Sequence, residues 1–473
     1  MKSKFINLLK AQSMKYVPFA DAASTELPIG KLLRLSLFQA VIGMVTSLLV
    51  GTLNRVMIVE LGMAAWLVAM AVAIPVVFAP LRALVGYRSD THPSALGLKR
   101  IPYMWMGTLL MFAGLAIMPF ALLLLSDPPP HTEWLGLTGV TLSFVLLGFG
   151  MQVTQTAGMA LASDLSTEEK RPRVVALLYS MLLLGMIGSS ILFGVFLSDF
   201  TPTHLIQVIQ GCAVVVVVFN LISLWKQEAR AEKRGPREDN GFHKNWQRML
   251  NQPGMRRFLW TVALGTAAFS MQDIILEPYG AEVLGLDVSM TSSLTALSAG
   301  GALLAFYLSS VLLNRGLDAC RLASAGVVLG LPAFAFVIFS APLSSALLFR
   351  SGTALIGFSS GLFSVGMLVM AMSFSEEKLA GLVLGAWGAV QATASGIAMA
   401  VGGFLRDLIG SLASSGALGS SLDTPATAYS FVYHIEIYLL FVVLIALGPL
   451  VRNIRQTQAS SNRSHFGLAE LPS

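Results

Sequence analysis

The residues of this sequence that could do chemistry are ionisable side chains inside long apolar stretches. Arg55 lies in the apolar stretch 35–58, Asp273 and Glu277 lie in the stretch 257–279, and His434 lies in the stretch 430–451. Ionisable groups are costly in a lipid environment and are therefore candidates for function. Opposite charges can form an ion pair, and a neutral imidazole can ligate a metal ion such as magnesium.

The composition indicates a membrane protein. Of the 473 residues, 55% are hydrophobic and only 12% are charged, and the mean hydropathy is +0.73. A soluble chain carries roughly 25% charged residues. The net charge of +6 comes from basic residues in the intervals between apolar stretches, so we expect a lipid membrane and no nucleic acid as the partner. Cys212 and Cys320 are too far apart to indicate a metal site.

Apolar runs of roughly 20 residues predict about twelve membrane-spanning helices. They lie near 35–58, 63–84, 102–125, 135–162, 174–197, 205–225, 257–279, 290–313, 321–341, 346–372, 380–404 and 430–451. The predicted organisation is an amphipathic N-terminal segment (1–34), a six-helix half (35–225), a linker (226–257), a second six-helix half (258–451) and a tail (452–473). A disordered basic tail is the alternative for the N-terminal segment.

The basic residues predict the orientation of these spans. Of the 31 Lys and Arg residues, all but Arg55, Arg350 and Arg406 fall in the termini, in alternate intervals or at the span ends that adjoin these intervals, on one side of the predicted membrane. Because Lys and Arg are enriched in cytoplasmic loops, this side is predicted to be cytoplasmic. Both termini are then in the cytoplasm.

The two halves match each other in sequence. The Glu-Glu-Lys run at 168–170 corresponds to the Glu-Glu-Lys run at 376–378, and the same offset relates Asp199 to Asp407. Matches at a constant offset predict a duplicated six-helix unit. Glycines at 148 and 150, and at 381 and 385, are further expected to allow close helix packing.

The interval after the second span resembles a motif of the major facilitator superfamily. Residues 86–90 (GYRSD) match the G-x-x-x-D loop of that superfamily and are followed by Lys99 and Arg100. Gly86 allows a tight exit from the helix, and Asp90 can cap a helix or pair with arginines. The resemblance implies a cytoplasmic gating loop and an all-α major facilitator fold with two pseudo-symmetric six-helix halves. An ordinary basic loop is the alternative.

The facilitator resemblance also implies that spans 1 and 7 face each other. We therefore predict that Arg55 pairs with Asp273 or Glu277 in an outer charge cluster. Independent positions of these groups at the membrane interface are the alternative. The fourth span lacks a basic residue and the fifth lacks a proline, which argues against ordinary proton-driven exchange of a polar solute.

Several longer stretches are similar to a narrower family, the bacteriochlorophyll-delivery branch of this superfamily. They are residues 16–39, 51–63, 78–105 and 272–285 (QDIILEPYGAEVLG). The branch contains the light-harvesting complex assembly proteins of the LhaA/PucC family.

This resemblance implies a multi-pass protein of the bacterial photosynthetic inner (intracytoplasmic) membrane. It implies binding or delivery of bacteriochlorophyll, with carotenoid as a further pigment, to single-span antenna α/β polypeptides. We favour light-harvesting complex 1 as the client, with the reaction centre and bacteriochlorophyll synthase as further candidate partners. His434 is then the candidate axial ligand of the chlorin magnesium, and hydrogen-bonded packing is its alternative role.

Two other classes of function remain open. A conventional facilitator that transports a small amphipathic solute would also use the ionisable groups of spans 1 and 7. An enzyme of pigment synthesis is disfavoured, because the sequence contains no nucleotide-binding loop, no paired-aspartate diphosphate motif and no Cys/His metal cluster. We therefore expect a protein that is not an enzyme.

Overall fold

Helices make up the regular structure of this chain. The computed structural model describes residues 28–77, 85, 98–126, 133–166, 171–228, 242–374 and 380–464, and no strand occurs among these residues. Within them, 11 helices are long and apolar enough to cross a membrane. The predicted span 63–84 is represented by the shorter helix α3 (Ala65–Val77), and 78–84 lies outside the described residues. The predicted all-α membrane fold is confirmed.

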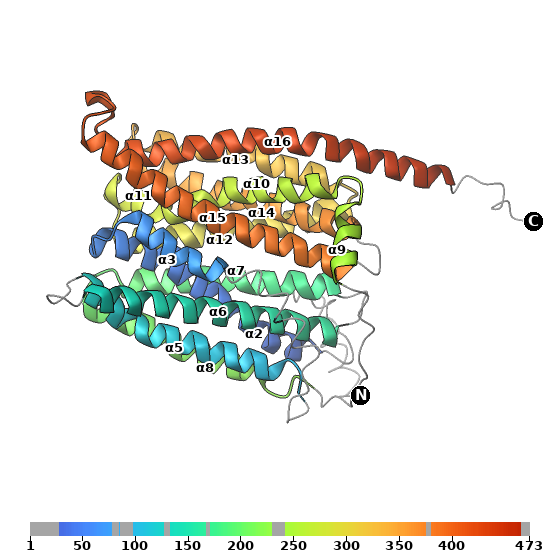
Figure 1. The fold of residues 1–473 in the computed structure, drawn as a ribbon, viewed down its shortest axis with the longest axis horizontal. Coiled ribbons are helices and arrows are strands. Elements are labelled where there is room, and N and C mark those ends of the chain that lie inside the picture. Colours follow the sequence, from blue (N-terminus) through green and yellow to red (C-terminus); the bar gives the residue numbers. More distant parts are fainter. Residues whose placement is uncertain are drawn as a thin grey trace, which may run out of the picture. The chain divides into compact units, whose positions relative to one another are not determined.

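The chain divides into two units. The first unit comprises Met1–Met63, Ala71–Pro236 and Asp287–Ala296. Its described elements are α2 (Ile29–Thr46), the π-helical segments η2 (Ser47–Leu53) and η3 (Val56–Glu60), the end of α3, α5 (Ile101–Ser126), α6 (Glu133–Leu165), α7 (Arg171–Phe196), α8 (Pro202–Leu224) and the start of α12. All but the start of α12, which is yellow, are blue to green in Figure 1.

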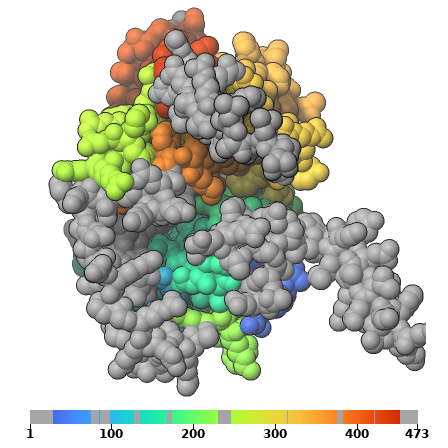
Figure 2. Space-filling model, turned by 90° about the vertical axis from the view of Figure 1, so that its right-hand side faces the viewer, coloured from blue at the N-terminus to red at the C-terminus, as the bar shows by residue number. Residues whose placement is uncertain are grey.

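The second unit comprises Ala64–Met70, Arg237–Leu286 and Leu297–Ser473. The start of α3 belongs to it, and α9 lies on the side of this unit that faces the viewer in Figure 2. Its other elements are α9 (Phe242–Leu250), α10 (Met255–Ser270), η4 (Met271–Ile274), α11 (Leu276–Glu282), most of α12 (Val288–Asn314), α13 (Ala319–Ser340), α14 (Ala346–Ser373), α15 (Ala380–Ser414), η5 (Ser420–Leu422) and α16 (Pro425–Ser464).

The same helix pairings recur in both units. In the first unit α5 packs on α6 and α8, and α2 packs on α7 and α8. In the second unit α13 packs on α14 and α16, and α10 packs on α15 and α16. Each pair in the second unit occupies the place, in chain order, of a pair in the first. The predicted duplication of a six-helix unit is therefore confirmed in its packing.

Small residues allow the close pairs to form. A β-carbon at Gly150 of α6 would lie 2.6 Å from the carbonyl oxygen of Gly107 in α5. One at Gly326 of α13 would lie 2.6 Å from the carbonyl oxygen of Ser359 in α14. The expectation for Gly385 is wrong, because no atom lies within 4 Å of a β-carbon built there.

Several helix ends differ from the predicted spans. Helix α2 begins at Ile29, directly after Pro28, whereas the predicted span begins at 35. Helix α16 continues to Ser464 in a stretch too polar to count as a span. The predicted linker 226–257 contains α9, whose apolar residues alternate with Lys, Asn, Gln and Arg, so its overall hydropathy is low. The predicted amphipathic segment lies almost entirely outside the described residues.

Candidate functional site

The seventh span, within the second unit, is interrupted. Helix α10 ends at Ser270, the short 3₁₀ turn η4 follows, and α11 begins at Leu276. Pro278 explains the interruption, because it lacks an N–H and its ring collides with the carbonyl of the residue four positions earlier, Ile274. Interrupted spans leave backbone groups free to bind other groups, and transporters form sites at such breaks. This break is therefore a candidate site.

Glu436 of α16 contacts the backbone at this break. Its Oε1 accepts a hydrogen bond of 2.6 Å from the backbone N–H of Gln272. The Glu436 side chain is 0% exposed. The interruption therefore brings a buried carboxyl group against η4, and neither Glu436 nor Gln272 was among the residues predicted for the site.

Asp273 lies beside Gln272 and lines a pocket of the second unit. The Nε2 of Gln272 donates to Oδ1 of Asp273 at 2.7 Å. The pocket has a volume of about 160 Å³, and its other lining residues are mostly polar: Thr266, Phe269, Ser270, Gln272, Ser298, Ile356, Ser360, Phe363, Ser364 and Gln391. Ligand sites for drug-sized molecules run to about 300–1,000 Å³. The pocket suits a small polar group and is too small for a chlorin ring.

The structure gives Arg55 a partner inside its own unit. Arg55 lies between the π-helical segments η2 and η3, and π-helical turns occur often at functional sites. Its Nη1 is 2.5 Å from Oε1 of Glu60, and the Arg55 side chain is 5% exposed. Glu277, in α11 of the second unit, is 1% exposed. Pairing of Arg55 with Asp273 or Glu277 stays a prediction.

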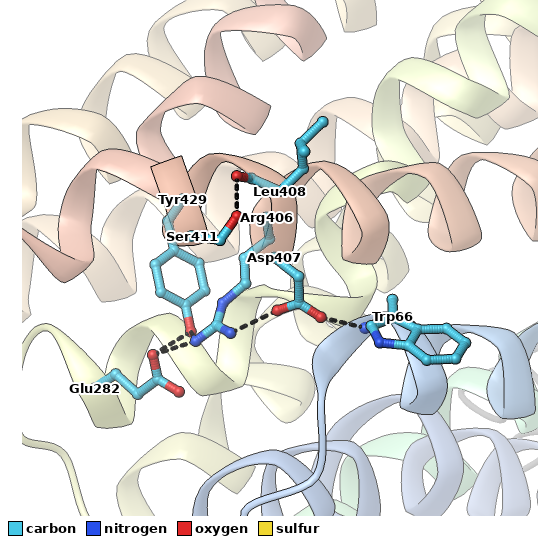
Figure 3. Close-up of polar contacts among 7 residues, drawn as sticks. All are labelled: Trp66, Glu282, Arg406, Asp407, Leu408, Ser411 and Tyr429. Carbon is cyan, nitrogen blue, oxygen red and sulfur yellow. Dashed lines mark hydrogen bonds and ion pairs between the residues drawn. The ribbon is translucent and has the colours of Figure 1, made fainter. Parts of the chain in front are cut away.

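Arg406 of α15 is the centre of a second polar cluster, which sequence reasoning did not assemble. Figure 3 shows its guanidinium between two carboxylates: Nη2 is 2.5 Å from Glu282 and Nη1 is 2.7 Å from Asp407. The hydroxyl of Tyr429 in α16 donates to Glu282 at 2.7 Å, and the guanidinium carbon is 5.0 Å from the Tyr429 ring centroid. The cluster joins α11, α15 and α16.

Asp407 extends this cluster to α3. Its Oδ2 accepts a hydrogen bond of 2.7 Å from the backbone N–H of Trp66, in the first turn of α3 (Figure 3). The first N–H groups of a helix have no partner within the helix, and a carboxylate there is favourable. The match of Asp407 to Asp199 in the repeat was a signal for this residue, but it did not predict the contact.

Lys99 and Arg100, predicted as gating residues, lie directly before α5 in the first unit. Oxygens of the Glu228 carboxylate accept from the backbone N–H groups of Lys99 at 2.8 Å, Arg100 at 3.0 Å and Ile101 at 3.1 Å. The Nε of Arg100 is 3.1 Å from Asp164 of α6. Gly86 and Asp90 lie outside the described residues, so gating by this loop stays a prediction.

Replacing Glu228 is expected to destabilise the first unit in graded steps. Glu228→Gln keeps one acceptor oxygen but loses the charge, whereas Glu228→Ala leaves the N-terminus of α5 without its cap. Losing a helix cap costs about 1 kcal/mol. Thermal unfolding of the detergent-purified protein should show its midpoint falling from wild type to Gln and then to Ala. Equal midpoints for all three proteins would contradict a capping role.

His434 lies on an exposed face of α16. Its Nδ1 is 2.6 Å from the carbonyl oxygen of Ser430. A carbonyl only accepts, so Nδ1 carries the proton and the lone pair of a neutral imidazole is on Nε2. A histidine held in this way through one nitrogen can ligate a metal through the other.

Comparisons with known proteins place the chain in a family. The sequence matches the family described as PUCC protein over residues 52–454. A Rhodobacter capsulatus protein, described as an uncharacterized protein in the puhA-bchM intergenic region, is 48% identical over 473 residues, 98% of each chain. Protein PucC of Rhodovulum sulfidophilum is 48% identical over 412 residues, 85% of this chain and 91% of that one.

A solved structure shares the fold. A mutant of the nucleoside transporter NupG gives a TM-score of 0.66 at 14% sequence identity, covering 88% of this chain and 98% of that one. At this identity the likeness concerns the fold alone, and it agrees with the predicted facilitator architecture.

Proposed function

The chain belongs to the PucC protein family, and from this premise we propose that it is an assembly factor for photosynthetic antenna complexes. It binds bacteriochlorophyll and passes it to single-span antenna polypeptides, with light-harvesting complex 1 as the favoured client. The observation that carries the proposal is the family match over residues 52–454, which includes nearly all the spanning helices. The protein acts by binding and not by catalysis, in the photosynthetic inner membrane and with both termini in the cytoplasm.

The lipid-facing surface is the place for such partners. Large apolar side chains are exposed along α5, α7, α8 and α16. A single-span polypeptide can contact such faces without leaving the bilayer, where van der Waals packing between helices drives association. The pocket at Asp273, at about 160 Å³, cannot hold a chlorin. We therefore place the pigment on a helix face and not in this pocket.

His434 and the exposed face of α16 that follows it toward the C-terminus fit such a pigment site. The imidazole has its Nε2 lone pair available, because Nδ1 donates to Ser430. Tyr438 is 66% exposed and Ile445 is 73% exposed on the same helix, about one and three turns further along. These side chains offer an apolar surface for the ring and its tail, next to one axial donor for magnesium.

His434→Leu is expected to reduce the bacteriochlorophyll that co-purifies with the protein severalfold, with little change in yield. His204→Leu is the matched control, because His204 is partly exposed and its Nδ1 is 2.8 Å from the carbonyl oxygen of Asp199. The absorption spectrum at equal protein concentration measures the bound pigment. Full pigment stoichiometry in His434→Leu would remove this residue from the site.

The assembly function is tested by isolating the tagged full-length protein in mild detergent from phototrophically grown membranes. Absorption spectroscopy and mass spectrometry of the same fraction should detect bacteriochlorophyll together with antenna polypeptides, and the polypeptides identify the client. The reaction centre and bacteriochlorophyll synthase are further candidates in the same sample. A protein that purifies without pigment or antenna polypeptides contradicts the proposal.

Transport of a small amphipathic solute is the second candidate function, and the pocket at Asp273 is the observation that favours it. The pocket combines an acidic group with serine, threonine and glutamine side chains, which suits a small polar group. Flux of a solute in proteoliposomes that is lost in Asp273→Asn would support transport. Absence of flux, together with pigment in the purified protein, would leave assembly as the function.

A further inference from the structure

The carboxyl group of Glu436 is buried and has a hydrogen bond on only one of its two oxygens. Its Oε1 accepts from the backbone N–H of Gln272, whereas Oε2 has no hydrogen-bond partner. The side chain is 0% exposed. An ionised carboxylate in such a place is very unfavourable unless a cation or several donors compensate it.

No cation lies within ion-pair distance of Glu436 among the described residues. The elements packed against α16 are α10, α11, α13, α15 and η4. The titratable groups that interact electrostatically with Glu436 are acidic or phenolic: Asp273 of η4 and Tyr433 of α16. The other titratable groups on this part of α16 are Tyr429 and His434, and the Nδ1 of His434 is held by the carbonyl oxygen of Ser430. Tyr279 of α11 interacts with Tyr433.

The nearby arginines are held elsewhere. Arg406 of α15 is engaged by Glu282 and Asp407, at the level of Tyr429. Arg257 of α10 donates to the carbonyl of Ala446. Along α16, Tyr429 lies roughly 10 Å before Glu436 and Ala446 lies roughly 15 Å after it. Neither arginine therefore compensates a charge on Glu436.

The side-chain oxygen of Gln272 also receives no hydrogen bond. Its Nε2 donates to Asp273, but its Oε1 has no partner although the side chain is 3% exposed. The break therefore holds two buried acceptor oxygens, Oε2 of Glu436 and Oε1 of Gln272, without donors. A proton on the carboxyl group changes Glu436 from a pure acceptor into a donor and removes its charge.

We propose that the break in the seventh span is a proton-binding site, with the proton carried by Glu436. This proposal is independent of the assembly function. Asp273 and Gln272 both line the pocket beside the break, and in this proposal the pocket is the route by which water reaches Glu436. A proton fits better than a metal ion, because no group of three or more His, Cys, Asp or Glu side chains in the described part of the chain could hold a metal.

The proposal gives the break two states. With the proton bound, the neutral carboxyl group accepts from the N–H of Gln272 and stabilises the 3₁₀ turn. When the proton leaves, a buried negative charge remains beside Asp273, and like charges at short range repel. The turn must then rearrange or admit water, so protonation controls the conformation of the seventh span.

Infrared spectroscopy of the purified full-length protein tests where the proton is. At neutral pH the wild-type protein should show the C=O stretch of a protonated carboxyl group, shifted in heavy water. Glu436→Gln should lose this band, and Asp273→Asn should keep it. Persistence of the band in Glu436→Gln, or its loss only in Asp273→Asn, overturns the assignment to Glu436.

Thermal unfolding against pH is the second measurement. The folded protein holds a proton that an unfolded glutamate releases above its usual pKa of about 4.3, so stability is highest at low pH and falls as the pH rises. The wild-type midpoint should fall by more than that of Glu436→Gln, which keeps a neutral acceptor for Gln272 at every pH. Identical pH profiles of the two proteins overturn the proposal. A wild-type protein that sodium stabilises more than potassium at fixed pH, when Glu436→Gln shows no such difference, overturns it as well.

Discussion

Replacing Gly185 with valine is expected to prevent accumulation of the folded protein. A β-carbon at Gly185 of α7 would fall well inside contact distance of the backbone carbonyl of Ala40 in α2. The crossing is tight from both sides, because a β-carbon at Gly43 of α2 would overlap the carbonyl of Leu182 in α7. Backbone atoms cannot turn away as side chains can. The cost should therefore reach or exceed the upper end of the about 1–3 kcal/mol usual for overpacking.

Gly188 of the same helix is the matched control. No atom lies within 4 Å of a β-carbon built at Gly188, so Gly188→Val should accumulate as the wild type does. Fluorescence size-exclusion chromatography of the two variants as fusions to a fluorescent protein compares the amount of monodisperse protein. Comparable peaks for Gly185→Val and Gly188→Val would mean that α2 and α7 do not cross closely at this point.

The spanning helices could be predicted from the sequence because hydropathy alone defines them. A run of about 20 apolar residues has no stable alternative to a helix in lipid, where every backbone group needs a partner. The duplication was likewise visible, because the runs at 168–170 and 376–378 keep one offset. Hydropathy did not predict the polar helical segments, because α9 and the end of α16 contain no apolar run.

The candidate site was predicted only in part. Asp273 was identified by its charge inside a span, and the structure places it on a pocket. The break beside it depends on Pro278, a local signal that hydropathy ignores. Glu436 was visible as an acidic residue in the last span, but its contact with Gln272 joins positions far apart in sequence.

The ion pairs show the same limit. The predicted pairing of Arg55 with a residue of another span stays a prediction, and the partner that the structure shows is Glu60, five residues along the chain, at 2.5 Å. Arg406 was noticed as a charge at the outer end of a predicted span, but its partners Glu282 and Asp407 come from two helices. Hydropathy and charge reveal which groups need partners, and only packing decides which partner each receives.

Arg406→Ala is expected to destabilise the second unit strongly. The substitution leaves the carboxylates of Glu282 and Asp407 without their shared cation and removes the contact with the Tyr429 ring. Removing one partner of a buried ion pair costs about 3–5 kcal/mol. Arg406 is 20% exposed, and solvent screening lowers the expected cost to about 2–3 kcal/mol. Asp407 also holds the first turn of α3 through Trp66, so this turn should loosen with it.

Two further variants separate charge from geometry at this cluster. Arg406→Lys keeps the charge but cannot bind both carboxylates through a planar fork, so its unfolding midpoint should lie between those of the wild type and Arg406→Ala. Arg350→Ala is the control, because Arg350 of α14 forms no ion pair among the described residues. Hydrogen exchange of the first turn of α3 should rise in Arg406→Ala and stay at the wild-type rate in Arg350→Ala. If both alanine variants unfold at the wild-type temperature, the cluster does not stabilise the second unit, and the contact between Asp407 and Trp66 forms without the help of Arg406.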